Sequence, residues 1–233
     1  MPVIKRAKKL CHFAHIPKCA GRSVEKYCES AGLKVGFLDV GYIANPALQP
    51  WNLSSPQHID GISLARLFPA DFFDFGFAVV RHPASRFISA FKYNSLVGRK
   101  QLLGRDVNHF VENDLRSAAY TLGVLDNHFL PQCQFLMPDL DYEVFKLELG
   151  LSKVKQFIDH RFSLSVHVEM GHENQGRKQC DGTDLAINLS SSSMKIIEDV
   201  YDDDYRKFDY RKESAKSEVG FWSLFSTRGS KDA

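Results

Sequence analysis

Apolar and polar residues follow the same order in two separate parts of the chain. Apolar residues dominate positions 10–16, and the loop Pro-Lys-Cys-Ala-Gly-Arg follows at 17–22. The apolar run FAVV at 77–80 lies between Gly76 and Arg81, and Pro83 comes shortly after it. An amphipathic segment follows each loop. Each pattern therefore predicts a buried β-strand, a tight loop and a helix.

Further elements extend this arrangement along the chain. The segment 34–40 predicts a strand, and the segment 142–147 predicts a strand that is followed by a helix over 150–162. A helix is predicted over 190–201, with Ser190 to Ser193 as its capping residues, and another begins near Asp106. Three strand–helix units favour an α/β fold with a parallel sheet flanked by helices.

The first loop has the composition of an anion site. The first N–H groups of a helix lack intrahelical partners, and the helix dipole places partial positive charge there. Lys18 and Arg22 add two full charges, and Ser23 is predicted to cap the helix. The loop departs from the Walker pattern, because Lys18 precedes Gly21. The alternative interpretation is an ordinary strand–helix turn with a solvated lysine.

The second loop places a further cation at the end of a strand. Pro83 lies where a helix should start, and the spacing of Arg86, Ser89 and Tyr93 puts these residues on one helix face. Arg81 lies at the carboxyl end of the preceding strand, the end at which open α/β sheets bind their ligands. Two cationic loops of this kind suit a ligand with two separate anionic groups.

Length, charge and cysteine content exclude several classes of protein. With 233 residues, 44% hydrophobic and 25% charged, the chain predicts one globular domain over 1–213 and a C-terminal tail over 214–233. A net charge of +2 is too small to indicate nucleic-acid binding. Five cysteines without a CxxC pair favour free thiols in a reducing compartment over disulfides or zinc. No apolar run is long enough for a membrane segment or a signal peptide.

Both loops resemble motifs of one enzyme family. HIPKCAGRS at 15–23 resembles the 5′-phosphosulfate loop of sulfotransferases that use 3′-phosphoadenosine 5′-phosphosulfate (PAPS), and VVRHPASRFISAFKY at 79–93 resembles their 3′-phosphate motif. PQCQFL at 131–136 and VYDDDYRKFDY at 200–210 look like the carbohydrate branch, which includes heparan sulfate 2-O-sulfotransferase and bacterial relatives. Cys19 and Arg22 stand where threonines are frequent, and His82 replaces the usual Asp or Asn.

The resemblance implies a fold and a set of donor-binding residues. It implies a P-loop-NTPase-like, three-layer fold with a central parallel sheet. Lys18 would stabilise the leaving phosphate, and Arg81 with Ser89 would bind the 3′-phosphate. The 5′-phosphosulfate would be held by the first loop, namely by Lys18, Cys19, Ala20, Gly21, Arg22 and Ser23. PAPS is the expected co-substrate, and no metal is expected.

His58 is the predicted catalytic base, because an imidazole titrates near neutrality and a histidine in this region acts as base in the 2-O-sulfotransferases. Asp60 is the alternative, either as the base or as the group that orients His58. Four sets of residues are further candidates for substrate contact: His128 and Gln132; the aromatic residues Tyr42 and Trp51; the basic cluster Arg99, Lys100 and Arg105; and Arg177 with Lys178 in the polar loop 172–183. For the aromatic and basic residues, packing or solvated charge is the competing interpretation.

The prediction is a sulfotransferase with a glycan or small hydroxylated acceptor, without nucleic-acid partners, in a bacterial cytoplasm. A soluble fragment of a Golgi-type enzyme is the alternative for its location. Two other functions stay open. One is a P-loop-like nucleotide kinase or hydrolase, which would require Mg²⁺. The other is a non-catalytic module that binds a nucleotide or an anionic glycan. The sequence decides neither the acceptor nor the oligomeric state.

Overall fold

The computed structural model describes residues 2–39, 41–45, 52–97, 101–165, 168–171 and 187–213. The strands are β1 (Val3–Arg6), β2 (Lys9–Ala14), β3 (Lys34–Gly36), β4 (Phe75–Val80) and β5 (Tyr142–Lys146). The α-helices are α1 (Gly21–Ser30), α2 (Gly61–Leu67), α3 (Pro83–Lys92), α4 (Val107–Asn113), α5 (Leu115–Tyr120), α6 (Ser152–Phe162), α8 (Ser191–Val200) and α9 (Asp202–Lys207). Short 3₁₀ helices include η3 (Pro56–His58), η6 (Val124–Asn127), η7 (Gln132–Phe135) and η8 (Leu147–Leu149), and a π-helical turn, η5 (Tyr93–Val97), continues α3.

The strands form one mixed sheet in the order β3-β1-β2-β4-β5. Strands β2, β4 and β5 are parallel, with Phe13 opposite Phe77 and Val80 opposite Lys146. They are the strands of the three predicted strand–helix units. Strand β1 pairs antiparallel with both β2 and β3. The predicted parallel sheet is therefore correct for three strands and wrong for the other two.

The sequence prediction failed at the N-terminal hairpin for a local reason. Strand β1 has the sequence VIKR, in which only two residues are apolar and the two charged residues are exposed. So short a segment carries little strand signal by itself, and pairing with β2 supplies the missing stabilisation. The strand predicted over 34–40 is shorter in the structure, where it ends at Gly36.

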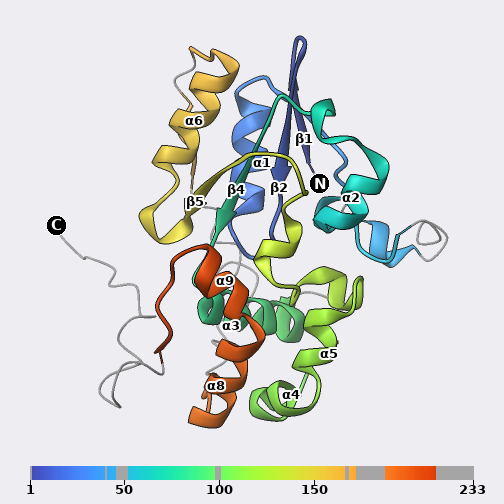
Figure 1. Ribbon diagram of the computed structural model, residues 1–233, viewed down its shortest axis with the longest axis vertical. Helices are drawn as coiled ribbons and strands as arrows, with labels where there is room; N and C mark the ends of the chain where they lie inside the picture. The colour runs from blue at the N-terminus through green and yellow to red at the C-terminus, as the bar shows by residue number, and fades with distance from the viewer. Residues whose placement is uncertain are drawn as a thin grey trace.

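Alternation of side chains along the strands places helices on both faces of the sheet. Ile4, Cys11 and Phe13 share a core with residues of α1 and α6, such as Val24 and Ile158. Val3, the neighbour of Ile4, contacts a second core that contains Leu64 of α2. Because successive strand residues point to opposite faces, α1 with α6 covers one face and α2 covers the other. Figure 1 shows these helices around the strands.

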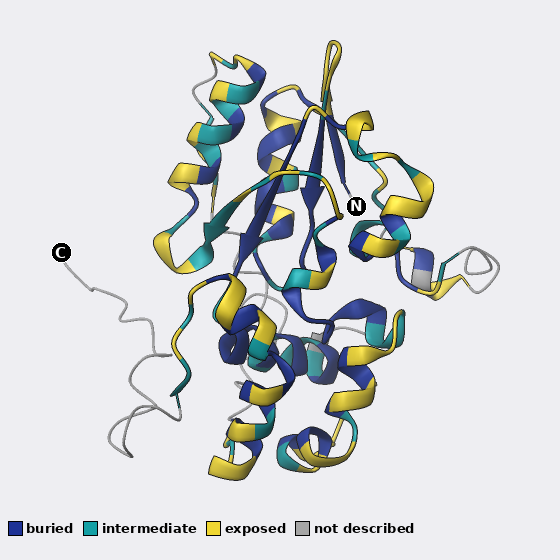
Figure 2. Cartoon of the chain, in the orientation of Figure 1, coloured by how far each residue is buried: buried dark blue, intermediate teal, exposed yellow. Residues whose placement is uncertain are grey.

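A separate group of helices lies beyond one end of the sheet. Helices α3, α4, α5, α8 and α9 surround their own buried core, which includes Phe87, Phe110, Phe129, Ile197 and Tyr201. Figure 1 shows this helical group below the sheet, with α3 directly after the carboxyl end of β4. Figure 2 shows that dark blue, buried residues continue from the strands into the helices below. The carboxyl ends of β2 and β4 therefore face the helical group.

Local sequence signals explain most of the helix starts. Pro83 is the first residue of α3, as predicted, and Asp106 caps α4 by accepting a hydrogen bond from the amide of His109. Ser190 caps α8 through the amide of Ser193. No helix in the described ranges is long and apolar enough to cross a membrane. The predicted tail 214–233 lies outside the described residues.

Candidate active site

The loop between β2 and α1 exposes backbone amides at a helix N-terminus. Lys18 and Ala20 have positive φ angles of 69° and 61°, which turn the chain sharply before α1 begins at Gly21. The amides of Ala20, Gly21 and Arg22 find no acceptor among the described residues. Successive free amides at the start of a helix form an anion-binding concavity. The predicted strand–loop–helix unit is therefore confirmed.

The predicted cap of this helix is wrong. The N-cap residue is Ala20, and it forms no side-chain capping bond. Ser23 lies inside the first turn, where its amide donates to the carbonyl of Ala20 over 3.0 Å. A side-chain cap would occupy an amide of the first turn, so its absence leaves those amides for a ligand.

Lys18 and Arg81 bring two partly buried cations together at the ends of neighbouring strands. Neither side chain forms an ion pair with a carboxylate in the part of the chain that the structure describes. Burial, and secondly the charge of Arg81, lower the pKa of Lys18 to about 8. Burial also lowers the pKa of Arg81. Cations that are shielded from solvent and form no ion pair with a described carboxylate favour an anionic ligand, which would compensate their charge.

Gln132 connects the two loops from a fully buried position. Its amide oxygen accepts from the backbone N–H of Arg81 over 2.9 Å and from the thiol of Cys19 over 3.4 Å. Its amide nitrogen donates to the carbonyl of Arg81 over 2.8 Å. Asp204 accepts hydrogen bonds from the amides of Gln132 and Cys133. We predicted Gln132 near the acceptor, but its amide group is used within the protein and fixes the distance between the loops.

Arg86 also forms its hydrogen bonds within the protein. It is fully buried, and its guanidinium donates to the carbonyls of His128 at 2.9 Å and Leu130 at 2.7 Å. The guanidinium also lies 5.2 Å from the centre of the Tyr201 ring. Arg86 thereby ties α3 to the segment that carries His128. On the same helix, Ser89 is only partly buried.

His58 lies at the end of η3, next to a buried carboxylate. Its Nδ1 is 2.9 Å from Oδ2 of Asp126, and its side chain is 12% exposed. Asp60, the predicted alternative partner, caps α2 by accepting from the amide of Ser63 over 2.9 Å. A carboxylate used as a helix cap is held away from the imidazole. The structure therefore assigns the carboxylate beside His58 to Asp126.

A row of ring contacts joins His58 to the first loop. The imidazole of His58 lies edge-on to His15, with centroids 5.0 Å apart, and edge-on to His128, at 5.3 Å. The His128 ring is 5.1 Å from the ring of Tyr93, and the ammonium of Lys18 lies 4.2 Å from the centre of that same ring. The structure thus places the predicted base and the predicted cationic loop in one continuous cluster.

Two histidines of this cluster, together with Asp126, resemble a set of metal ligands. One atom each from His58, Asp126 and His128 lies within 4.8 Å of the others, and imidazole and carboxylate are donors that zinc accepts. Each group also has hydrogen-bond partners within the protein. Asp126 accepts from the amide of Ser55, and Nδ1 of His128 accepts from Asn94 over 3.0 Å.

Comparison with known families gave one match. The model of the sulfotransferase family matches residues 3–211. This chain belongs to the sulfotransferase family. A search of curated proteins and a search of solved structures each found no match. The match covers both loops and His58, and it supports sulfuryl transfer in general.

Two residues that depart from the usual sulfotransferase motifs, Cys19 and His82, are held by contacts within the protein. The thiol of Cys19 is fully buried, and burial raises its pKa to about 12, so it stays protonated and is a poor nucleophile. His82 precedes α3, and its Nε2 donates to the carbonyl of Arg211 over 3.2 Å. The amide of His82 donates to Glu148 over 2.7 Å. His82 therefore ties the second loop to the segment after α9.

The remaining candidates divide into three groups. Tyr42 is buried and its hydroxyl donates to the carbonyl of Asn52, which supports the packing interpretation. Arg105 forms an ion pair with Asp114, so it belongs to the surface of the helical group. The other five candidates lie outside the described residues: Trp51, Arg99, Lys100, Arg177 and Lys178.

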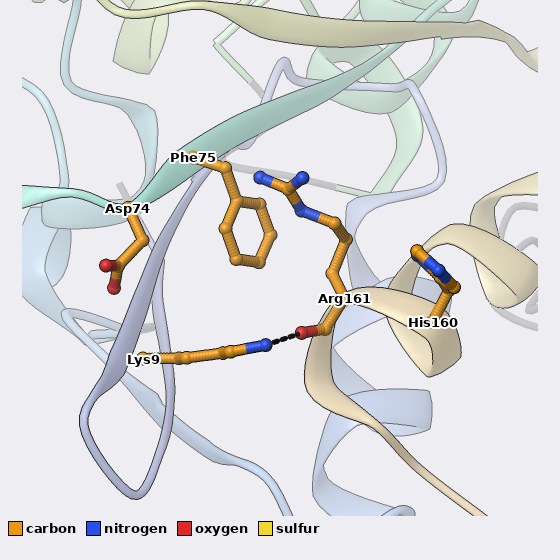
Figure 3. Close-up of a pocket in the computed structure, with 5 residues that line it drawn as sticks. All are labelled: Lys9, Asp74, Phe75, His160 and Arg161. Atoms are coloured by element: carbon orange, nitrogen blue, oxygen red, sulfur yellow. Dashed lines mark hydrogen bonds between the residues drawn. The ribbon is translucent and has the colours of Figure 1, made fainter.

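A cavity of about 290 Å³ lies at the opposite end of the sheet. Lys9, Asp74 and Phe75, from the amino ends of β2 and β4, line it together with His160 and Arg161 of α6. Figure 3 shows the ammonium of Lys9 directed at the carbonyl of Arg161, to which it donates over 2.7 Å. The Arg161 guanidinium lies over the ring of Phe75. The charges of Lys9 and Arg161 thus contact other lining residues, and the cavity is separate from the loops at the carboxyl ends.

Proposed function

We propose that this protein transfers a sulfuryl group from PAPS to a hydroxyl or amine of a carbohydrate acceptor by in-line displacement, on a P-loop-like fold. The observation that carries the proposal is the pair of partly buried cations, Lys18 and Arg81, beside loop amides that lack acceptors among the described residues. PAPS carries anionic groups at the 3′ and 5′ positions of its ribose. The two cationic loops, which Gln132 connects at a fixed distance, match this pair of groups.

The first loop is proposed to bind the 5′-phosphosulfate. The amides of residues 20–22 would donate to its oxygens, with Cys19 and Ser23 completing the loop. Arg22 is exposed and adds charge at the entrance. Lys18 would contact the bridging oxygen and stabilise the charge that develops on the departing phosphate. Removing one electrostatic contact of this kind typically costs about 3 kcal/mol of transition-state stabilisation.

The second loop is proposed to bind the 3′-phosphate. The guanidinium of Arg81 presents paired N–H donors that match phosphate oxygens, and the hydroxyl of Ser89 would add a further donor. Because Gln132 bonds to both the amide and the carbonyl of Arg81, the backbone of this loop is held in place before a ligand arrives. Preorganisation of this kind reduces the entropy that binding would cost.

His58 is proposed to take the proton of the acceptor. As the acceptor oxygen forms its bond to sulfur, the bond from sulfur to the phosphate oxygen breaks, and the hydroxyl proton passes to Nε2 of His58. That nitrogen has no hydrogen-bond partner in the described ranges, which is the state required of a base. The carbohydrate acceptor is inferred from the motifs that resemble the carbohydrate branch.

Calorimetric titration with adenosine 3′,5′-bisphosphate and with ADP, each with and without Mg²⁺, tests the donor site. We expect tight binding of the 3′,5′-bisphosphate that Mg²⁺ does not change, and weak binding of ADP. A preference for ADP with Mg²⁺ would instead indicate a kinase or hydrolase. Binding of neither ligand would contradict the proposal.

A further inference from the structure

The turn that carries Asp126 has an unusual backbone. Leu125, Asp126 and Asn127 have φ angles of 49°, 58° and 59°, and they follow Gly123 at 83°. A non-glycine residue such as Leu125 in this left-handed region costs about 1 kcal/mol or more, whereas Asp and Asn adopt it more readily. Three such residues in succession still persist only where other contacts compensate. Strain of this kind is concentrated at functional sites. The compensating contacts of this turn are made to His58 and its neighbours.

Two residues of the turn contact His58 from different sides. Asp126 lies 2.9 Å from its Nδ1, and Asn127 donates to its backbone carbonyl over 2.8 Å. The other end of Asn127 accepts from the amide of Gly123 over 2.7 Å, which closes the turn. The strained backbone therefore fixes both the imidazole and the main chain of the same residue.

The carboxylate of Asp126 is itself held in one orientation. Its Oδ1 accepts from the amide of Ser55 over 2.6 Å, and its Oδ2 accepts from the hydroxyl of Ser55 over 3.0 Å. Asp126 is 5% exposed. Burial alone would raise the pKa of this carboxyl, but the charge and hydrogen bond of His58, the charge of His128 and the amide of Ser55 hold that pKa below its usual range. The group is therefore a fixed anion that can only accept hydrogen bonds.

From this geometry we propose that Asp126 is the positioning residue of the transfer reaction: it holds the Nδ1–H tautomer of His58 and so keeps the lone pair on Nε2. The inference rests on the proposed role of His58 as base. An ionised carboxylate beside Nδ1 requires the proton on that nitrogen, and the edge-on rings of His15 and His128 limit rotation of the imidazole. Asp126 acts through His58 and does not touch the substrate.

Nitrogen-15 NMR of the histidine side chains tests the tautomer without any need for turnover. The His58 signals are assigned among the nine histidines by their loss in His58→Ala. We expect the wild-type protein, at a pH where His58 is neutral, to show the Nδ1–H form. In Asp126→Asn the Nε2–H form should become populated, because the amide NH2 of asparagine can donate a hydrogen bond to an unprotonated Nδ1. An Nε2–H tautomer in the wild-type protein would overturn the proposal.

Kinetics of the full chain supply the second measurement. Asp126→Asn should lower kcat about 100-fold or more and leave both KM for the donor and affinity for adenosine 3′,5′-bisphosphate within about threefold. Adding Asp126→Asn to His58→Ala should cost no further activity, because both act on one proton transfer. Asp106→Asn, which changes a capping aspartate in α4, is the matched control and should keep full activity.

The two measurements distinguish this proposal from the proposed function. If the Nδ1–H tautomer depends on Asp126 but no sulfuryl transfer is found with any acceptor, Asp126 still positions His58, and the proposed reaction is wrong. If transfer occurs and Asp126→Asn retains wild-type kcat, the positioning role is wrong, and the proposed function stands. A thermal unfolding curve of Asp126→Asn checks that any loss of kcat is measured on folded protein.

Discussion

The imidazole of His15 lies against the α-carbon of Gly21, so that a β-carbon on residue 21 would come within 1.8 Å of Nε2 of His15. The ring has little room to move. Its Nδ1 lies 2.7 Å from the carboxylate of Glu25, and its face is stacked on Phe13 at 5.6 Å. Gly21 is therefore required by packing, and His15 determines the shape of the anion-binding loop.

Gly21→Ala should distort this loop. We expect the free energy of unfolding to fall by about 1–3 kcal/mol, the usual cost of overpacking, and affinity for adenosine 3′,5′-bisphosphate to fall at least tenfold. Denaturant unfolding and calorimetry measure the two effects. Adding His15→Ala removes the clash and should recover part of the stability, whereas strictly additive losses would contradict the contact. Gly36→Ala, where the nearest atom is 3.9 Å away, is the control.

Lys18→Gln should make the free protein more stable while removing activity. The lowered pKa of Lys18, about 8, shows that the folded state disfavours its charge, mainly because of burial. Between pH values of about 8 and 10.5, the second being the ordinary pKa of lysine, Lys18 binds its proton more in the unfolded chain than in the folded protein. The free energy of unfolding that the buried charge removes at pH 7 therefore returns as the pH rises through this range. We expect a gain of about 1 kcal/mol at pH 7, after allowance for solvent contact.

Turnover of Lys18→Gln, and equally of Lys18→Ala, should fall by two orders of magnitude or more, because no cation then faces the leaving phosphate. Thermal unfolding at pH 7 and steady-state assays measure the two changes on the same samples. Lys8→Gln, which changes an exposed lysine in the turn between β1 and β2, should alter neither. A less stable Lys18→Gln protein would contradict the cost of the buried charge.

The pH dependence of kcat/KM should show the ionisation of Lys18. This quantity follows ionisation of the free enzyme, in which the pKa of Lys18 is about 8. Deprotonation of Lys18 removes the charge that stabilises the leaving group. We therefore expect kcat/KM to decline above about pH 8 and, at pH values well above the pKa, to fall about tenfold for each pH unit. An arginine stays protonated in this range, so the decline should be absent in Lys18→Arg. An unchanged decline in that variant would assign it to another group.

Arg81→Gln should remove discrimination between nucleotides with and without a 3′-phosphate. We expect affinity for adenosine 3′,5′-bisphosphate to fall about 100-fold, because a charge-assisted pair with phosphate is lost, and affinity for 5′-AMP to change less than threefold. Competition calorimetry gives both values. Arg116→Gln removes an exposed arginine, whose side chain is 60% exposed, and is the control. Equal losses for both nucleotides would place Arg81 elsewhere than at the 3′-phosphate.

His58→Ala should separate chemistry from donor binding. Loss of the base should reduce kcat by two orders of magnitude or more, whereas binding of adenosine 3′,5′-bisphosphate, measured by calorimetry, should stay unchanged. His109→Ala removes an exposed histidine of α4 and should behave as wild type. Normal turnover in His58→Ala would remove this residue from the role of base.

Local sequence patterns are sufficient to predict the two loop–helix units and most of the elements around them. The strand at 75–80, the helix that begins at Pro83 and the caps at Asp106 and Ser190 are all encoded by neighbouring residues. Local preferences of proline, aspartate and serine, and the apolar period of strands, act over a few positions and can be predicted without the fold. Lys18 and Arg81 are predicted from their motifs, and His58 from its residue type and its place in the family resemblance; their roles stay predictions.

The groups that surround those residues come from distant parts of the chain and depend on the packing of the whole fold. Asp126 meets His58 across 68 positions, and Gln132 meets Arg81 across 51. Asp60, two positions from His58, caps a helix instead. Neither distant contact leaves a local pattern, because each arises when the helical group packs against the end of the sheet. Buried polar groups must find partners wherever that packing brings them, so the geometry of the site depends on the whole fold.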